Sequence, residues 1–553
     1  MTASSYIESV KHLPVAVANE RLEKACGIQC FFECQDDVQN FLKSPEFAAP
    51  AKEEFGDWQT PMDLALAVCR LLKAEGVDPK VIVEPTCGQG NFILAALQVF
   101  EHVEEVFGIE VQKSYLEETK LQLLQFYQDH ADQVRPRIRL YCQNVFDFDF
   151  TAIKKSINHR EILVLGNPPW VTNSKLAEIG SGNIPPKRNF KKFGGLEAIT
   201  GKSNFDIAEY ISRQMVGLIA DEKGHLALLL KNSVIRNLVY GQYDGNMEIS
   251  SFRQYMIDAK KEFGVCVAAS LLHLTVGERK ARLCQVRDFY TRRNVLKYGW
   301  LNNHFVADVA AYEKCKFIDG QSSLVWRSGL KHDCAKVMEL TFNGSHYVNG
   351  LNEVVNIERD MIYPLLKSSD IKGRNITTVR KYVIVTQRST ADDTAWIKYK
   401  YPRTYQYLLD HAEYLDKRGS RIYRGRSRFC LFGIGEYSFK PYKVVVSGLY
   451  KQPNFSVVGP IAERIVMLDD TCYMLAFDRL SEALIIQRAL MSSPVQTFIR
   501  SLLFPDAKRA INKELLMRID LEKALACMPD VARTEAERQP YETVRTTRIG
   551  LEV

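Results

Sequence analysis

The strongest constraint on the fold is an apolar run, residues 162–166, that ends abruptly in Asn167-Pro168-Pro169-Trp170. A run of this length and composition predicts a buried strand of a parallel sheet. The two prolines cannot continue that strand, and they stiffen the backbone just beyond its C-terminal end. Open α/β sheets bind ligands at this edge, so the sequence predicts a rigid ligand platform here.

The platform suits a planar ligand that carries an exocyclic amino group. The side-chain oxygen of Asn167 and the carbonyl of Pro168 can both accept hydrogen bonds from an NH2 group, and Trp170 can stack on the ring. Two acceptors on one amino nitrogen draw its lone pair out of conjugation. The nitrogen can then attack an electrophilic methyl group before it loses a proton. The alternative interpretation is a strand followed by a polyproline turn and a core tryptophan.

A glycine-containing turn is the second strong signal. Residues 81–83 predict an apolar strand that ends in Glu84, and a loop with Gly88 and Gly90 leads into a helix over 92–100. This is the pattern of the first strand-turn-helix unit of a Rossmann-like sheet. The spacing is neither a dinucleotide fingerprint nor a P-loop. Glycines allow a ligand to approach the backbone closely, and the acid favours an ammonium or sulfonium over phosphates.

Two further strands continue the alternation of strands and helices. Residues 106–110 end in Glu110, and an acid at that position commonly hydrogen-bonds ribose hydroxyls. Residues 138–142 are followed by Asn144 and Asp147 with aromatic neighbours, which suits the edge and face of an adenine. Four strands therefore each present a polar residue at the C-terminal end. This ordered set predicts an α/β fold with a nucleoside-containing cofactor.

Upstream, Thr60-Pro61 precedes a helical pattern over 62–72. Thr60 is expected to cap the helix and Pro61 to occupy its first position. A functional interpretation places this turn over the cofactor pocket.

Two basic segments are candidates for nucleic-acid contact. The loop 179–193 directly follows the platform, and its basic residues either clamp a phosphate backbone or form a solvated surface loop. Residues 417–428 contain six basic residues and no acid, with aromatic residues among and after them, which favours a nucleic-acid groove. The candidate contacts are Lys187, Arg188, Lys191, Lys192, Arg421, Arg424, Arg426 and Arg428.

Composition limits the class of protein. With 46% hydrophobic and 25% charged residues the chain is an ordinary globular one, and no apolar run approaches a membrane span. Thirteen cysteines without a regular framework predict a reducing compartment, the cytoplasm. Cys26, Cys30 and Cys34 are expected to be small core thiols and not metal ligands. A net charge of +7 permits a nucleic-acid partner.

In the order of these parts the chain resembles the γ-class DNA N6-adenine methyltransferases of restriction-modification systems. The resemblance covers residues 55 to about 525: Phe-Gly-Asp-Trp-Gln-Thr-Pro (55–61) comes first, then the glycine turn (84–92), then Asn-Pro-Pro-Trp (167–170). Tyr-Pro-Leu-Leu-Lys (363–367) resembles the entry into a target-recognition domain, and the stretch from Phe504 resembles its closing helical part.

The resemblance implies S-adenosylmethionine as cofactor, double-stranded DNA as substrate, and base flipping. It implies catalytic roles for Asn167, Pro168, Pro169 and Trp170, although Tyr or Phe is more frequent at the last position. It implies cofactor contacts for Thr60, Pro61, Glu84, Pro85, Gly88, Gly90, Asn91, Phe92 and Glu110. The family has Asp followed by an aromatic residue just after the third strand, and Asp147-Phe148 has that pattern here. Asn144 is nevertheless favoured for the adenine edge because it stands directly at the strand end, and Asp147 is the alternative.

The predicted organisation is a helical extension (1–50), an α/β Rossmann-like catalytic domain (51–335), a mixed α+β target-recognition domain (336–526) and a polar tail (527–553). A monomer is expected, in the cytoplasm near the nucleoid, with no metal. The candidate protein partner is a separate restriction endonuclease or a defence-system subunit. The competing hypotheses are methyl transfer to RNA guanine N2 or to a protein glutamine nitrogen.

Overall fold

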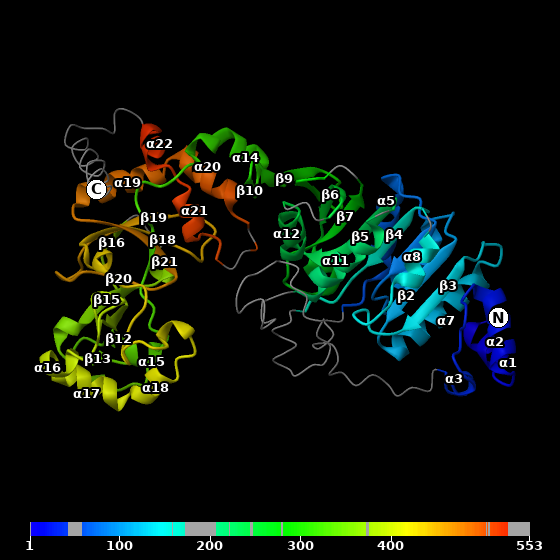
Figure 1. Ribbon diagram of the computed structural model, residues 1–553, viewed down its shortest axis with the longest axis horizontal. Coiled ribbons are helices and arrows are strands. Elements are labelled where there is room, and N and C mark those ends of the chain that lie inside the picture. Colours follow the sequence, from blue (N-terminus) through cyan, green and yellow to red (C-terminus); the bar gives the residue numbers. More distant parts are fainter. Residues whose placement is uncertain are drawn as a thin grey trace. The chain divides into compact units, whose positions relative to one another are not determined.

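The computed structural model describes residues 2–41, 58–157, 159–171, 206–220, 222–243, 247–277, 280–371, 375–504, 506 and 509–528 (Figure 1). The chain divides into two compact units, Met1–Phe305 and Val306–Val553, and each is considered by itself. The division comes earlier than the predicted domain boundary at residue 335. Residues after 305 join the second unit because α14 (Val309–Cys315) packs on α20 (Ser493–Leu502), with the rings of Tyr312 and Phe498 6.2 Å apart.

The first unit is built on one mixed sheet, and its described strands follow the order β10-β9-β8-β6-β7-β5-β4-β1-β2-β3. Strands β5, β4, β1, β2 and β3 are parallel neighbours. The strands are β1 (Val81–Glu84), β2 (Glu105–Glu110), β3 (Arg137–Cys142), β4 (Ile162–Gly166), β5 (Gly224–Lys231), β6 (Ile249–Met256), β7 (Ala269–Val276), β8 (Leu283–Asp288), β9 (Asn294–Leu301) and β10 (His304–Val306).

Helices cover the sheet on both faces, as the continuously apolar strands require. Every residue of β4 is buried, and Leu163 and Leu165 join the core cluster formed with α5 (Met62–Ala74) and α6 (Asn91–Val99). The other described helices of this unit are α1 (Ala3–Val10), α2 (Val15–Cys26), α3 (Gln35–Asn40), α7 (Lys113–Asp129), α8 (Thr151–Ile157), α11 (Ile207–Ile219), α12 (Asn232–Gly241) and α13 (Ala259–Phe263). The predicted α/β fold is confirmed.

The N-terminal helices dock at the β3 edge of the sheet. Ile28 forms a parallel bridge with Ile138 of β3, and the Lys120 ammonium of α7 donates to the carbonyl of Phe31. The expectation for the three cysteines is wrong in part, because Cys26 is buried whereas Cys30 and Cys34 are exposed. They do not share one helix face, since Cys26 ends α2 and Cys34 caps α3.

The predicted helix cap is also shifted. Pro61, with an extended backbone, precedes the first helical residue of α5 and occupies the N-cap position. Thr60 therefore lies outside the helix, and its side chain caps nothing. This leaves its hydroxyl available to the cavity described below.

The second unit combines helices with two sheets and has the predicted mixed α+β character. Its described strands form the orders β11-β21-β18-β19-β16 and β14-β13-β12-β17-β15-β20. They are β11 (Arg327–Ser328), β12 (Glu339–Phe342), β13 (Tyr347–Val348), β14 (Val354–Val355), β15 (Ile362–Leu366), β16 (Asn375–Ile376), β17 (Lys381–Ile384), β18 (Tyr442–Ser447), β19 (Phe455–Val458), β20 (Met467–Leu468) and β21 (Cys472–Phe477).

The helices of this unit are short, apart from α19 (Leu480–Leu490) and α20. These two helices are separate because Ser492 has an extended backbone and Pro494, in the first turn of α20, favours the start of a new helix. The others are α15 (Ala335–Met338), α16 (Ile397–Lys400), α17 (Pro402–Asp410), α18 (Ala412–Asp416), α21 (Lys513–Met517) and α22 (Leu521–Ala526), with 3-10 turns at Lys316–Ile318, Arg359–Met361, Ser368–Asp370, Arg421–Tyr423 and Glu436–Phe439.

Candidate active site

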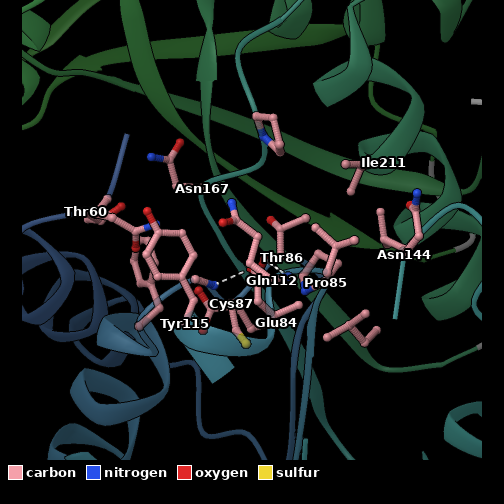
Figure 2. A pocket seen from close by; sticks show the side chains of 18 of the residues that line it. Thr60, Glu84, Pro85, Thr86, Cys87, Gln112, Tyr115, Asn144, Asn167 and Ile211 are labelled. Carbon is pink, nitrogen blue, oxygen red and sulfur yellow. Dashed lines mark hydrogen bonds between the residues drawn. The ribbon is translucent and has the colours of Figure 1, made fainter. Parts of the chain in front are cut away.

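A cavity of about 830 Å³, including its open mouth, lies at the C-terminal ends of β1, β2, β3 and β4. This is the edge at which the sequence predicted a ligand. In Figure 2, Thr60 and Asn144 lie on opposite sides of the cavity, with Glu84 and Cys87 between them. The lining includes these predicted residues: Thr60, Glu84, Pro85, Gly88, Asn91, Phe92, Glu110, Asn144, Asn167 and Pro169.

The glycine turn is fixed by the acid of the neighbouring strand. The carboxylate of Glu110 accepts a hydrogen bond from Gly88 N at 2.8 Å and another from Gln112 N at 2.9 Å. Gly88 has φ +51° and Gly90 has φ +78°, backbone angles that residues with a Cβ rarely adopt. A Cβ on Gly90 would lie 2.5 Å from Cγ2 of Thr119. Both glycines are therefore required by the backbone geometry of this turn.

Glu84 is a buried acid at the floor of the cavity. Its side chain is 2% exposed, and burial, reinforced by the negative charge of Glu110, raises the pKa of Glu84 well above its ordinary value. Among the described residues Oε2 of Glu84 has no hydrogen-bond partner. A cationic ligand would supply the charge and the hydrogen that this carboxyl lacks.

Four buried side-chain oxygens in the lining share this lack of a partner within the described part of the chain. They are Thr60 Oγ1, Glu84 Oε2, Thr86 Oγ1 and Asn167 Oδ1. Buried polar atoms are nearly always hydrogen-bonded, so four such acceptors in one cavity indicate a ligand rich in hydrogen-bond donors.

Residues 58–60 cross the cavity and contact two other elements. Asn167 Nδ2 donates to the carbonyl of Trp58 at 2.8 Å, and Asn91 Nδ2 donates to the carbonyl of Thr60 at 2.8 Å. Between them, Oε1 of Gln59 accepts from Gln89 N at 3.2 Å. The amide nitrogen of Asn167 is thus engaged, while its oxygen is the orphaned acceptor.

Asn144 and Asp147 are separated by the structure. Asn144 lines the cavity, and its Oδ1 accepts a hydrogen bond from Phe146 N at 3.0 Å. Asp147 is exposed and does not contribute to the lining. The geometry favours Asn144 over Asp147 for a cofactor contact, and Phe146 and Val111 add apolar surface beside it.

Trp170 and Pro168 do not line the cavity, and neither do Pro61 and Gly90. The indole of Trp170 is 8% exposed, its Nε1 donates to the carbonyl of Leu229 at 3.2 Å, and its ring meets Phe263 edge-on at 5.3 Å. The stacking platform predicted for Trp170 is therefore not formed in this conformation, because β5 and α13 offer the ring a hydrogen bond and a core contact.

One relative identifies the family to which the chain belongs. The sequence is 39% identical over 473 residues to the type II methyltransferase M.NspV of Nostoc sp. (strain PCC 7524), covering 85% of this chain and 97% of that protein. The chain belongs to the type II methyltransferases. No family model matches the sequence of this methyltransferase.

A solved structure shows the same fold at much lower identity. The type IIL restriction-modification enzyme MmeI, determined in complex with DNA, matches the methyltransferase with a TM-score of 0.52 and 13% identity. The match covers 87% of this chain and 67% of MmeI. The similarity of fold to MmeI therefore covers most of the chain.

The candidate DNA contacts of the methyltransferase have different environments. Lys187, Arg188, Lys191 and Lys192 lie outside the described residues. Arg428 is paired with Asp416 at 2.5 Å, and Arg426 donates to the carbonyl of Thr390. Arg421 and Arg424 are exposed, and neither forms an ion pair or hydrogen bond through its side chain with a described residue. These two are the cations most available to a ligand.

Several residues that line the cavity were not predicted from the sequence. Val111, Gln112 and Tyr115 follow Glu110, and Ile207 and Ile211 come from α11. The position of Val111, directly after the acid that ends β2, is a signal that could have identified it. The isoleucines carry no such signal, because an amphipathic helix is expected to bury them anyway.

Within the described ranges, no cluster of His, Cys, Asp or Glu is arranged to hold a metal ion. In the same ranges, no helix combines the length and the apolarity needed to cross a membrane.

Proposed function

We propose that this methyltransferase is a γ-class enzyme that transfers a methyl group from S-adenosylmethionine to N6 of an adenine at a specific site in duplex DNA. The observation that carries the proposal is the orphaned Oδ1 of Asn167, a buried acceptor in the cavity lining. An exocyclic amino group is the donor that this oxygen lacks. The resemblance to M.NspV supports a type II methyltransferase activity, and the motif order supports adenine N6 as its target.

The cavity fits the proposed cofactor. S-adenosylmethionine carries an ammonium group, ribose hydroxyls and a sulfonium, which match the buried acid Glu84 and the hydroxyls of Thr60 and Thr86. Glu110 would face the ribose and Asn144 the adenine. When bound, the cofactor supplies an electrophilic methyl group.

The residues of the chain would then perform two tasks. Oδ1 of Asn167 and the carbonyl of Pro168 accept hydrogen bonds from the amino group of the target, which frees its lone pair for the methyl. Pro168 and Pro169 hold these acceptors rigidly. The extra proton leaves the nitrogen after transfer, so no general base is assigned. Stacking by Trp170 requires the indole to leave its contact with Phe263.

The substrate imposes base flipping, because an amino group inside a duplex cannot enter a cavity at the edge of a sheet. Extrusion costs a few kcal/mol of stacking and pairing. We assign sequence recognition and phosphate contacts to the second unit, with Arg421 and Arg424 among them. We further propose a monomer that acts in the cytoplasm, alongside a separately encoded restriction endonuclease.

The test is nucleoside mass spectrometry after the purified protein has reacted with unmethylated plasmid DNA and isotope-labelled S-adenosylmethionine. Labelled N6-methyldeoxyadenosine is expected. Labelled N4-methyldeoxycytidine would retain the amino-group chemistry but contradict the choice of base. Label found only in RNA guanine or protein glutamine, supplied in parallel reactions, would replace DNA as the substrate.

A further inference from the structure

Residues 58–60 form hydrogen bonds with Asn167 and with the glycine turn, and in each of these bonds residues 58–60 provide the acceptor. The segment supplies the acceptors: the carbonyls of Trp58 and Thr60 and the side-chain Oε1 of Gln59. The donors are Asn167 Nδ2, Asn91 Nδ2 and Gln89 N, at 2.8, 2.8 and 3.2 Å respectively. Two of these donors belong to the glycine turn and the start of α6, and the third is the proposed catalytic amide.

The bond to Trp58 determines which end of the Asn167 amide faces the target. An amide has a donor end and an acceptor end, and the carbonyl of Trp58 accepts only from the donor end. The oxygen is consequently left buried and without a partner among the described residues. If the amide rotated, an NH2 group would face the amino group of the substrate, donor against donor, and the proposed reaction would lose its acceptor.

The position of the Trp58 carbonyl depends in turn on Gln59. The Gln59 side chain lies directly over Gly88, where a Cβ would come within 2.5 Å of its Oε1. Gly88 N is held by Glu110, so one chain of contacts leads from the proposed ribose-binding acid through Gly88 and Gln59 to residue 58. Asn91 holds the other side of the segment at Thr60.

We propose that Gln59 and Asn91 are positioning residues that hold the Trp58 carbonyl so that it orients the catalytic amide of Asn167. This inference rests on the proposed function and deepens it. Asn91 was assigned a direct cofactor contact from the resemblance, and the hydrogen bond to Thr60 adds this second role. Gln59 was assigned no role from the sequence.

The test compares Gln59→Met with Gln59→Glu. Met matches the length of Gln but removes the acceptor for Gln89 N, whereas Glu retains an acceptor oxygen. Four quantities are measured: kcat on duplex DNA, the KM for DNA, the dissociation constant of S-adenosylmethionine by calorimetry, and base extrusion by the fluorescence of 2-aminopurine at the target position. We expect Q59M to lower kcat about tenfold, as loss of one hydrogen bond implies. Q59E should restore kcat to within about threefold.

The cofactor dissociation constant and the 2-aminopurine signal of Q59M should stay within about threefold of wild type, because the defect lies in amide orientation. Q59M with normal kcat at saturating cofactor, or with all of its loss in cofactor affinity, would overturn the inference. An inactive wild type would overturn the proposed function and the inference together. If Q59M does not fold, as judged by its melting temperature, Gln59→Leu, which also lacks the acceptor for Gln89 N, is held to the same criteria.

Discussion

The residues that define this site are those whose buried oxygens form no hydrogen bond with the described part of the chain. Thr60, Glu84, Thr86 and Asn167 each bury an oxygen that finds no partner in the described part of the chain. Burial of an unpaired polar group costs free energy. Four such groups in one cavity are therefore expected only where a bound ligand forms hydrogen bonds with them. Each position can be tested by a substitution that preserves shape.

Asn167 carries the chemistry in this account. Asn167→Ala removes the acceptor for the target amino group, so kcat should fall by at least about 100-fold, the range for losing one preorganised polar group. The affinity for S-adenosylmethionine, measured by calorimetry, should change little. A folded N167A protein that retains wild-type turnover would contradict the catalytic role, and one that loses cofactor binding would move Asn167 into the cofactor site.

Glu84 gives a pH dependence with a definite sign. Its raised pKa means that the free folded protein prefers the neutral acid, whereas the unfolded chain ionises near 4.5. Below that value both states are protonated and the shift has no effect. As pH rises above it, the unfolded state loses the proton first, so Glu84 lowers the free energy of unfolding until its folded pKa is passed.

Glu84→Gln should therefore raise the melting temperature of the cofactor-free protein above that pH, with the gain growing as pH increases. The same variant should bind S-adenosylmethionine about tenfold or more weakly, because a charge-assisted hydrogen bond is lost. Thermal melts from about pH 5 to 8, paired with calorimetry, measure both effects. A variant that melts lower at every pH and binds normally would contradict the assignment.

At the scale of the elements, local signals predicted the parallel half of the sheet and little beyond it. Strand β4 has the predicted bounds and β1 ends at Glu84 as expected, because apolar runs that end in polar or proline residues specify both the strand and its edge. Beyond β5 the strands pair out of chain order: β7 is antiparallel to both β5 and β6, and β8 is parallel to β6, an arrangement that no local pattern encodes. The contacts of Trp170 with Leu229 and Phe263 were not predicted for a similar reason, because they are non-local.

The glycine turn allows a controlled test of backbone geometry. Gly90 and Gly76 both have positive φ, but a Cβ on Gly90 would meet Thr119 at 2.5 Å whereas one on Gly76 would meet nothing within 4 Å. Gly76→Ala should cost about 1–2 kcal/mol of unfolding free energy from strain alone. Gly90→Ala should cost more and also weaken cofactor binding. Equal losses in urea denaturation would show that the contact with Thr119 is irrelevant.

For the whole molecule, we propose that the second unit binds DNA. Its strands pair mostly antiparallel and its helices are short, so the sequence predicted its mixed character but not its topology. The basic run at 417–428 was predicted as one binding surface. The structure divides it into cations that pair within the fold, such as Arg428, and two exposed ones, Arg421 and Arg424, whose side chains form no ion pair or hydrogen bond with a described residue.

Arg421→Ala combined with Arg424→Ala should therefore weaken duplex binding and reduce the slope of log affinity against log salt by about two, one for each phosphate contact. Arg428→Ala is the matched control, because its guanidinium is paired with Asp416. Fluorescence anisotropy at several salt concentrations measures both variants. An equal loss in R428A would mean that this ion pair opens on DNA, and an unchanged double variant would remove the surface from the interface.

We propose that this methyltransferase methylates adenine N6 at a defined DNA site through Asn167. Single-molecule sequencing of genomic DNA from a methylation-free host that expresses the chain tests it most directly. We predict N6-methyladenine at one short motif, and its disappearance when Asn167→Ala is expressed at the same level. No modified motif from a folded protein that binds S-adenosylmethionine, or a motif that persists in the N167A strain, would contradict the account.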